Sequence, residues 1–280
     1  MEITNNIAIA AQLGAALQKP NTEHGGIAYC TIPEGYKLHD LEHLLPQPTR
    51  KRAAVITTTP TSFIDYINLH SQGQDSNIYA DIDSEKSHCN LVAVIDDNSS
   101  IGPAWRDHTC QLAPRLAVEW ARWMSKNKAS MTQSQFAAWL EDNLRDIASV
   151  PGMPSGTDIL QMALGFEANS DKKFRSKINL QSGGVQFEFV EDETKETRTR
   201  MTVFERFTLG IPVFDGASSA YPLEARLKYR EKSGEITFWY ELIRPDRVFK
   251  TAVAAELENI KQGTGLLIIY GKHIIYGKHI

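Results

Sequence analysis

The residues with the clearest chemical spacing are two histidines near the start of the chain. His39, Glu42 and His43 have the H-x-x-E-H spacing of inverted zinc peptidases, in which two histidines one helical turn apart bind zinc and the glutamate acts as a base. Such a site needs a helix of several turns, whereas Pro46 ends this segment almost at once. We therefore expect a short surface turn here without a bound metal, and rank a metal-dependent hydrolase third among the functions considered.

A second set of metal-binding residue types lies on two predicted strands. His88 is followed directly by Cys89, and His108 precedes Cys110 by two residues. Because successive side chains of a strand alternate between its faces, these spacings aim the four side chains poorly at one ion. We expect ordinary strand residues. With Cys30, the cysteines form no C-x-x-C pair, which fits a reducing compartment.

Motifs for nucleotide binding and covalent catalysis are missing from the sequence. It contains no G-x-G-x-x-G after a predicted strand, no G-x-x-x-x-G-K-[ST] and no G-x-S-x-G. The sequence thus gives no catalytic residue, no cofactor and no metal site, and we expect a non-enzymatic protein.

Cations interleaved with aromatic rings mark the predicted strands between residues 172 and 243. Basic side chains alternate there with apolar ones, as on the polar face of a half-buried sheet. The candidate binding face consists of Arg175, Arg198, Arg200, Phe204, Arg226, Lys228, Arg230 and Trp239. Three interpretations stay open: a solvated, salt-bridged face, a contact with another protein, and a platform for single-stranded nucleic acid on which bases stack.

The distribution of charge bears on that choice. The chain has 280 residues, is 42% hydrophobic and 23% charged, and carries a formal net charge of −4. Residues 1–170 contain 12 basic and 19 acidic side chains, whereas residues 171–250 contain 15 and 13. Because the chain lacks the overall excess of Lys and Arg that drives nucleic-acid binding, we favour a protein partner over nucleic acid.

The location follows from the same composition. No apolar run reaches the roughly 18 residues that a membrane-spanning helix needs, and Glu2 stands where a secretory signal would carry basic residues. We expect a cytoplasmic protein without a membrane partner.

The elements that would position these residues begin with a mixed module of helices and strands. The predicted helices are 3–18 and the segment that follows Thr59 and Pro60, where a threonine cap and a proline at the first helical position agree. The predicted strands are 27–32, 53–58, 77–82 and 88–95.

The middle of the chain is predicted to be helical. We expect helices over 116–126, 131–147 and 157–168, the second with Thr132 and Gln135 in capping-box spacing. Trp120 and Trp123 are expected in the core rather than at a stacking site. The segment VPGMPSG at 150–156 is typical of a linker.

From residue 172 the hydrophobic period changes to two, which predicts an antiparallel meander. Its clearest part is a hairpin with Ser233 and Gly234 as the turn, because only a two-residue loop keeps the apolar faces matched. That register places Arg226 opposite Glu241 and Lys228 opposite Trp239. A last helix is expected from Arg244 to about Lys261.

The tail repeats itself. Residues 269–274 read IYGKHI, and residues 275–280 read IYGKHI again. Because six is even, both copies would present the same side chains to the same face of a strand. Two interpretations are open: a duplication introduced by cloning, and an arm for assembly, since an apolar strand left unpaired promotes association.

Four blocks of the sequence together resemble a known family. They are GGIAYCTIPEGYKLHDLEHLLPQPTRKRAAV, FTLGIPVFDG, YPLEARLKYR and LIRPDRVFKTAVAAEL. Through them the chain resembles, over roughly residues 25–274, the YfdQ family of uncharacterised phage and prophage proteins. The resemblance implies an early or accessory role in tailed phages, with no catalytic residues to carry over. The second IYGKHI departs from the ending expected for that family, which favours the cloning interpretation.

These observations predict an α+β fold with a mixed N-terminal module, a helical middle, and a C-terminal antiparallel meander covered by the last helix. We expect a boundary near residue 152, giving segments 1–152 and 153–280, or one continuous domain. The expected function is that of a phage accessory protein that forms a homo-oligomer or binds a host or phage protein. The alternative is a nucleic-acid-associated protein of phage replication or recombination.

Overall fold

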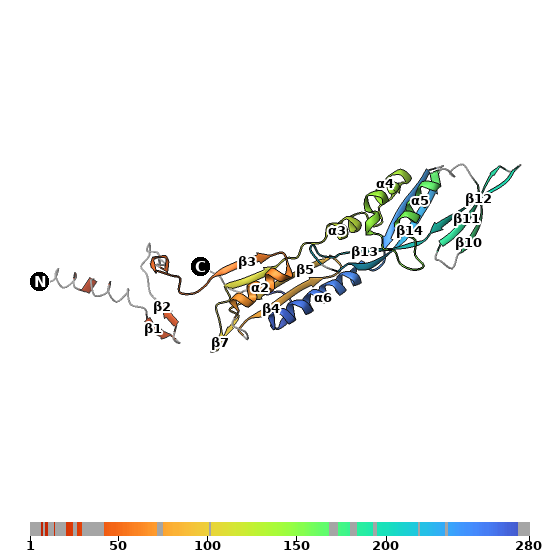
Figure 1. Cartoon of the computed structure of the whole chain (residues 1–280). Coiled ribbons are helices and arrows are strands. Elements are labelled where there is room, and N and C mark those ends of the chain that lie inside the picture. Colours follow the sequence, from red (N-terminus) through yellow and green to blue (C-terminus); the bar gives the residue numbers. More distant parts are fainter. Residues whose placement is uncertain are drawn as a thin grey trace. The chain divides into compact units, whose positions relative to one another are not determined.

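The fold of the chain was derived from a computed structural model (Figure 1). It describes residues 42–71, 75–100, 102–167, 173–179, 184–192, 195–217, 219–232 and 235–273, and before them residues 7, 9–10, 14, 21–24 and 27–29. The chain divides into two compact units, Met1–Lys51 and Arg52–Ile280. Helices and strands are both abundant, which confirms the α+β class.

The first unit contains a short strand pair and one turn of 3-10 helix. β1 (Asn21–His24) pairs antiparallel with β2 (Ile27–Tyr29). The 3-10 turn η1 (Glu42–Leu44) is followed by Thr49, whose backbone N–H and side-chain hydroxyl both donate to the Glu42 carboxylate. Within the predicted helix 3–18, residues 7, 9–10 and 14 are helical, and the others lie outside the described residues.

The second unit contains a five-stranded sheet in the order β16-β4-β5-β8-β3. Its strands are β3 (Ala53–Thr57), β4 (Asn77–Asp83), β5 (His88–Val94), β8 (His108–Leu112) and β16 (Ile268–Tyr270). β3 runs parallel to β8 and β16 parallel to β4, whereas the other neighbours are antiparallel. A small ribbon of β6 (Asn98–Ser99) and β7 (Gly102–Pro103) connects β5 to β8.

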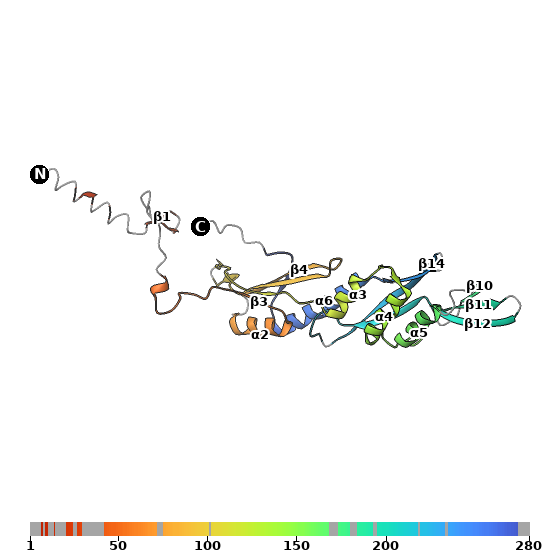
Figure 2. The same cartoon turned by 90° about the horizontal axis from the view of Figure 1, so that it is seen from above.

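Two helices cover one face of this sheet, α2 (Pro60–His70) and α6 (Pro245–Thr264), as Figure 2 shows. The predicted cap of α2 is confirmed, because the Thr59 hydroxyl accepts from the Ser62 N–H at 3.3 Å. Phe63 of α2 is fully buried against the sheet. Among the described residues, no helix lies on the opposite face of the sheet (Figure 2).

A four-stranded sheet forms the other part of the second unit, in the order β13-β14-β15-β9. Its strands are β9 (Met131–Thr132), β13 (Arg206–Ile211), β14 (Tyr221–Lys232) and β15 (Glu235–Leu242). The neighbouring helical elements are α3 (Val118–Ser125), α4 (Gln133–Asn143), η2 (Leu144–Asp146) and α5 (Gly156–Glu167). The capping box of α4 is present as predicted, with Thr132 and Gln135 bonded reciprocally.

Aromatic side chains join these helices to the sheet. Trp120 and Trp123 are at most 1% exposed, so their predicted place in the core is confirmed. The Trp123 ring lies 5.0 Å from that of Tyr240, and Phe136 stacks on Phe238 at 5.1 Å between ring centroids. The apolar face of the hairpin is thus buried under α3 and α4.

The predicted meander is wrong in one respect, because it forms two sheets instead of one. β10 (Lys173–Asn179), β11 (Gly184–Asp192) and β12 (Lys195–Phe204) make a separate three-stranded antiparallel sheet. The chain leaves it at Glu205, after which β13 pairs with β14. The alternation of apolar and polar residues continues across that bend. It therefore does not indicate where the chain leaves one sheet and joins the other.

The last helix forms close to its predicted bounds, at Pro245–Thr264 with Pro245 in its first turn, and it extends beyond the C-terminal strands. Phe249, in its first half, lies 5.6 Å from Phe214 and 6.3 Å from Trp120 between ring centroids, beside the four-stranded sheet. Its last turn instead contacts α2, where the Asn68 amide donates to the Gly263 carbonyl at 3.0 Å. α6 therefore spans both sheets and covers the C-terminal strands only with its first half.

The two predicted segments, 1–152 and 153–280, are joined by strand pairing. β9 precedes residue 152 and pairs with β15, which follows it. β16 at the end of the chain pairs with β4 of the first module. Residues on both sides of position 152 thus belong to the compact unit Arg52–Ile280.

Candidate functional site

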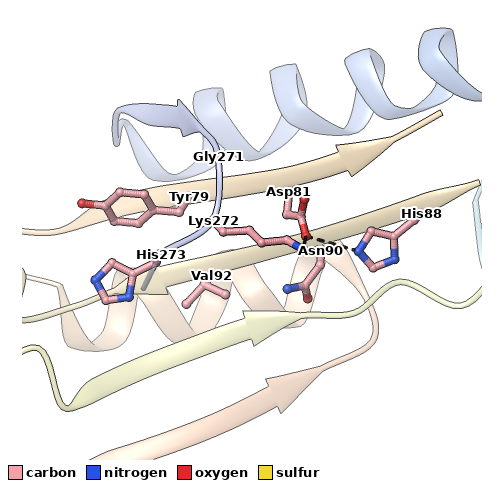
Figure 3. A pocket seen from close by; sticks show the side chains of 8 residues that line it. All are labelled: Tyr79, Asp81, His88, Asn90, Val92, Gly271, Lys272 and His273. Carbon is pink, nitrogen blue, oxygen red and sulfur yellow. Dashed lines mark ion pairs between the residues drawn. The ribbon is translucent and has the colours of Figure 1, made fainter. Parts of the chain in front are cut away.

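A groove of about 410 Å³ lies on the helix-free face of the five-stranded sheet. Figure 3 shows its lining side chains, which come from β4, β5 and the segment after β16. The lining residues are Tyr79, Asp81, His88, Asn90, Val92, Gly271, Lys272 and His273. All except the last three come from alternate positions of two strands whose other face is packed on α2 and α6.

A single carboxylate is the electrostatic centre of the groove. The Asp81 carboxylate lies 3.2 Å from the Lys272 Nζ and 3.6 Å from the His88 Nε2. Asp81 is the more buried partner in both pairs, with a side chain 27% exposed. This arrangement can hold a cationic side chain that arrives from the chain terminus.

Tyr79 forms the aromatic wall of the groove. Its ring lies 4.8 Å from that of His273 between centroids, and its hydroxyl donates to the Asp97 Oδ2 at 2.8 Å. Burial, followed by the hydrogen bond to Asp97, raises the pKa of Tyr79 above its usual value. The hydrogen bond to Asp97 therefore fixes the orientation of the Tyr79 ring. A ring held in this way can pack against another flat side chain.

The support behind Tyr79 is a buried carboxylate. Asp97 is 2% exposed; its Oδ1 lies 2.8 Å from the Arg106 Nε, and its Oδ2 also accepts from the Asn77 amide at 2.8 Å. A buried carboxylate needs such partners, because an unpaired one would cost several kcal/mol. The network ties the start of β4 to the segment that connects β5 to β8.

The His and Cys residues of the predicted strands, for which no metal site was expected, are not brought together. His88 faces Asp81 at one end of β5, whereas the His108 Nε2 lies 2.9 Å from the Tyr66 hydroxyl at the far end of β8. Cys110 pairs with Ala93 in the sheet. Within the described ranges no three His, Cys, Asp or Glu side chains are close enough to share a metal ion.

The predicted H-x-x-E-H segment folds as a turn in the part that is described. Glu42 and His43 belong to η1, and the Glu42 carboxylate is bound by Thr49. His39 lies outside the described residues. The Glu42 carboxylate, which would be the base in a zinc site, therefore accepts hydrogen bonds from Thr49 within a local turn.

The predicted register of the hairpin is confirmed in β14 and β15. Arg226 pairs with Glu241 and Lys228 with Trp239, as expected from matching the two faces. Arg226, Lys228 and Arg230 are exposed, and the Arg230 guanidinium lies 5.7 Å from the centre of the Trp239 ring. We call this surface the hairpin face.

The other members of the predicted face lie elsewhere. Arg198 and Arg200 belong to β12 and pair with Val190 and Glu188 of β11, so they sit on the three-stranded sheet. Arg175 is at a register shift in β10 of the same sheet. The prediction that all these cations share one sheet face is wrong, because the chain changes sheets at Glu205.

Phe204 is also not an exposed stacking ring. It is half-buried and packs against the hydrophobic core, and its N–H donates to the Met162 sulfur at 3.4 Å. Its neighbour Val203 is 1% exposed. Two successive residues can both be buried here because the strand ends at the bend, where α5 covers it.

The groove itself was missed by sequence reasoning. Tyr79 and Asp81 alternate with the buried Ile78 and Ala80, which is the signal of a polar sheet face. That signal was present in the predicted strands 77–82 and 88–95. The sequence did not indicate that the segment after β16 returns to β4. Without Lys272 beside Asp81, nothing in the two strands marks a binding site.

Comparison with known proteins places the chain in a family. None of the helices in the described ranges combines the length and apolar character that crossing a bilayer requires. No curated protein and no solved structure matches the chain significantly. One family model, DUF2303, described as an uncharacterized conserved protein, matches residues 3–273. Since this match spans nearly the whole sequence, the chain belongs to the DUF2303 family.

Proposed function

We propose that this chain is a non-enzymatic phage or prophage accessory protein that acts in the host cytoplasm by binding a protein partner, a second copy of itself included. The resemblance of its sequence blocks to the YfdQ family supports the phage role. The hairpin face supports the binding role.

The observation that carries the proposal is the charge of the hairpin face. Arg226, Lys228 and Arg230 project from one strand, and Glu224 and Glu241 are on the same face, while the pair Lys232 and Glu235 at its end adds one charge of each sign. Glu224 lies 3.7 Å from Arg206 of the neighbouring strand. Cations therefore remain in excess on a chain whose net charge is −4. Residues 1–170, with 19 acidic and 12 basic side chains, would supply a complementary surface in a second copy.

Nucleic acid is the competing ligand, and the geometry favours it less. A single-strand platform uses several exposed rings on which bases stack. On the hairpin face the aromatic ring is that of Trp239, which is half-buried, with Arg230 above it and its own Nε1 3.4 Å from the Glu241 carboxylate. A base could stack there only after Arg230 moved. Arg and Trp are, by contrast, the residues that most often dominate protein interfaces.

The test compares Trp239→Ala and the pair Arg226→Ala/Lys228→Ala with a matched control, Lys250→Ala, which removes an exposed cation from α6. Sedimentation at micromolar concentration measures native mass, and fluorescence anisotropy measures binding of a labelled single-stranded oligonucleotide. We expect an oligomeric wild type whose mass falls in both hairpin variants and stays unchanged in the control. Far-UV circular dichroism should be the same in all four proteins.

Two results would contradict the proposal. One is a wild-type chain that stays monomeric and binds the oligonucleotide at submicromolar concentration in about 150 mM salt. The other is an oligomer whose mass is insensitive to Trp239→Ala while oligonucleotide binding is lost. In either case the hairpin face would serve nucleic acid.

A further inference from the structure

The C-terminal segment lies on the sheet in the manner of a bound peptide. Ile268 and Ile269 of β16 pair in parallel with Ile78 and Tyr79 of β4. The Ile78 N–H donates to the Leu267 carbonyl at 3.0 Å, and the Gly271 N–H donates to the Ala80 carbonyl at 2.8 Å. The segment thus adds one strand to the edge of a sheet, as in peptide recognition by strand addition.

Two side chains then anchor the segment in the groove. Lys272 reaches Asp81, and His273 lies against the Tyr79 ring (Figure 3). Tyr79 is itself held by the buried Asp97. Because β4 and the loop that carries Asp97 are not part of the segment, the receptor is built independently of its occupant. We call the β4 edge with Tyr79 and Asp81 the tail seat.

Little surface holds the segment in place. Leu266 is buried, but Leu267 is 63% and Tyr270 73% exposed. The Lys272 side chain is 69% exposed, and exposed ion pairs contribute little stability. Short strands with few buried contacts open locally at low cost. Gly265, with a left-handed φ of 67°, ends α6 directly before the segment.

The sequence supplies a second occupant for the same seat. Residues 275–280 repeat residues 269–274 letter for letter, so Lys278 and His279 correspond to Lys272 and His273. Each chain therefore carries two identical ligand segments and one tail seat. The even spacing keeps the same side chains on the same face of an extended strand.

We propose that the tail seat of one molecule takes the segment Ile275–Ile280 of a second copy, after its own first segment has left. This contact goes beyond the proposed function, because it uses the five-stranded sheet and not the hairpin face. The tethered first segment competes at high effective concentration, so exchange depends on protein concentration. Such a head-to-tail contact can continue from copy to copy.

Disulfide trapping between full-length chains tests the exchange. The receptor chain carries Tyr79→Cys together with Lys272→Ala, which weakens its own first segment; the donor chain carries His279→Cys. The two are mixed, oxidised mildly and separated without reductant. We expect a covalent dimer that neither variant forms alone, and that wild type with its three native cysteines does not form.

Two controls make the result specific. Tyr79→Cys and His273→Cys in one chain should close an intramolecular disulfide, because the two side chains are in contact and the exposed segment can shift to the Cα separation of about 4.4–6.8 Å that a disulfide needs. Its formation would show that the receptor folds. Lys278→Ala in the donor should lower the dimer yield by up to about fivefold, the range of an exposed ion pair. Lys250→Ala in the donor, on α6, should leave the yield unchanged.

Three outcomes would overturn the proposal. The first is no intramolecular disulfide in the Tyr79→Cys/His273→Cys chain, which would remove the tail seat itself. The second is an intramolecular disulfide there but no covalent dimer in the mixture. The third is a Tyr79→Cys/His279→Cys chain that closes only within itself, because the second segment would then replace the first in the same molecule. None of these three outcomes involves Trp239 or the hairpin face. The proposed function is therefore tested independently of the tail seat.

Discussion

One hydroxyl fixes the start of α4. The Thr132 Oγ1 accepts from the Gln135 N–H at 3.3 Å, and the Gln135 side chain accepts from the Thr132 N–H at 3.0 Å. These two bonds satisfy backbone donors that the first turn of a helix leaves without an intrahelical acceptor. Thr132 also belongs to β9, so the cap fixes the point at which strand changes to helix.

We expect Thr132→Ala to lower the free energy of unfolding by about 1 kcal/mol, because a helix N-cap is lost while the exposed side chain leaves no cavity. Urea denaturation followed by circular dichroism measures it. Glu141→Ala, at an exposed position of the same helix, is the control and should change stability by only a few tenths of a kcal/mol. Equal effects of the two substitutions would show that the capping box is not formed.

The two described thiols are expected to be unreactive in the folded chain. Burial, followed by the nearby Glu256 and Asp81 carboxylates, raises the pKa of Cys89 to about 11, and burial raises that of Cys110 to about 11. Against an ordinary thiol pKa of about 9, the thiolate fraction at pH 8 falls about a hundredfold. Stability should accordingly decrease as pH rises from 9 to 11, since only the unfolded chain ionises there readily.

Alkylation by iodoacetamide, read by peptide mass spectrometry, measures this protection. Cys89 and Cys110 should react slowly at pH 8 in buffer and fast in denaturant. Labelling of either thiol at the rate of free cysteine under native conditions would contradict the burial that the sheet gives them.

At the scale of elements, β15 holds the helical middle of the chain. The Tyr240 hydroxyl donates to the Trp123 carbonyl at 2.7 Å inside the core, at the end of α3. The Lys128 N–H donates to the Tyr240 carbonyl at 2.8 Å, and the Asn127 side chain accepts from the Leu242 N–H at 2.9 Å. The loop after α3 is thus bonded along the edge of a strand far away in sequence.

We expect Tyr240→Phe to destabilise the fold by about 1–3 kcal/mol, because the buried Trp123 carbonyl loses its donor and water cannot replace it. The matched control is Tyr270→Phe, which removes the hydroxyl of a 73% exposed tyrosine and should be neutral. Thermal and urea unfolding of both variants provide the measurement. A neutral Tyr240→Phe would mean that the helical middle is not held through this bond.

At the scale of the whole molecule, we expect the tail to take part in the association of copies. Residues 275–280 form the second repeat, and their removal leaves the first repeat on β4 intact. We expect a chain ending at Ile274 to have a lower native mass than the full chain at high protein concentration, because each molecule then carries one ligand segment for one seat. Light scattering over a range of concentrations measures the difference.

The corresponding control is the full chain with Trp239→Ala, which alters the hairpin face and leaves the tail unchanged. Added to both chains of the disulfide-trapping pair, Trp239→Ala should leave the yield of covalent dimer unchanged. If truncation after Ile274 left the mass unchanged at every concentration, the second repeat would have no part in assembly, in agreement with a duplication introduced by cloning.

The amino-acid sequence by itself determined the local features of this protein. The caps at Thr59 and Thr132, the burial of Trp120 and Trp123, and the pairing of Arg226 with Glu241 all follow from residues within one or two neighbouring elements. Capping, hydrophobic period and a two-residue turn act over short distances along the chain. The residues of each segment are therefore enough to predict them.

Only the tertiary structure decided which distant segments share a sheet. The bend at Glu205 sends Arg198 and Arg200 to one sheet and Arg226 to another, and β16 crosses from the end of the chain to pair with β4. An apolar strand can satisfy its backbone on any open sheet edge, and its own residues do not specify which one. That choice depends on which edges the packed helices leave open, and it brings Lys272 to Asp81 and so creates the groove.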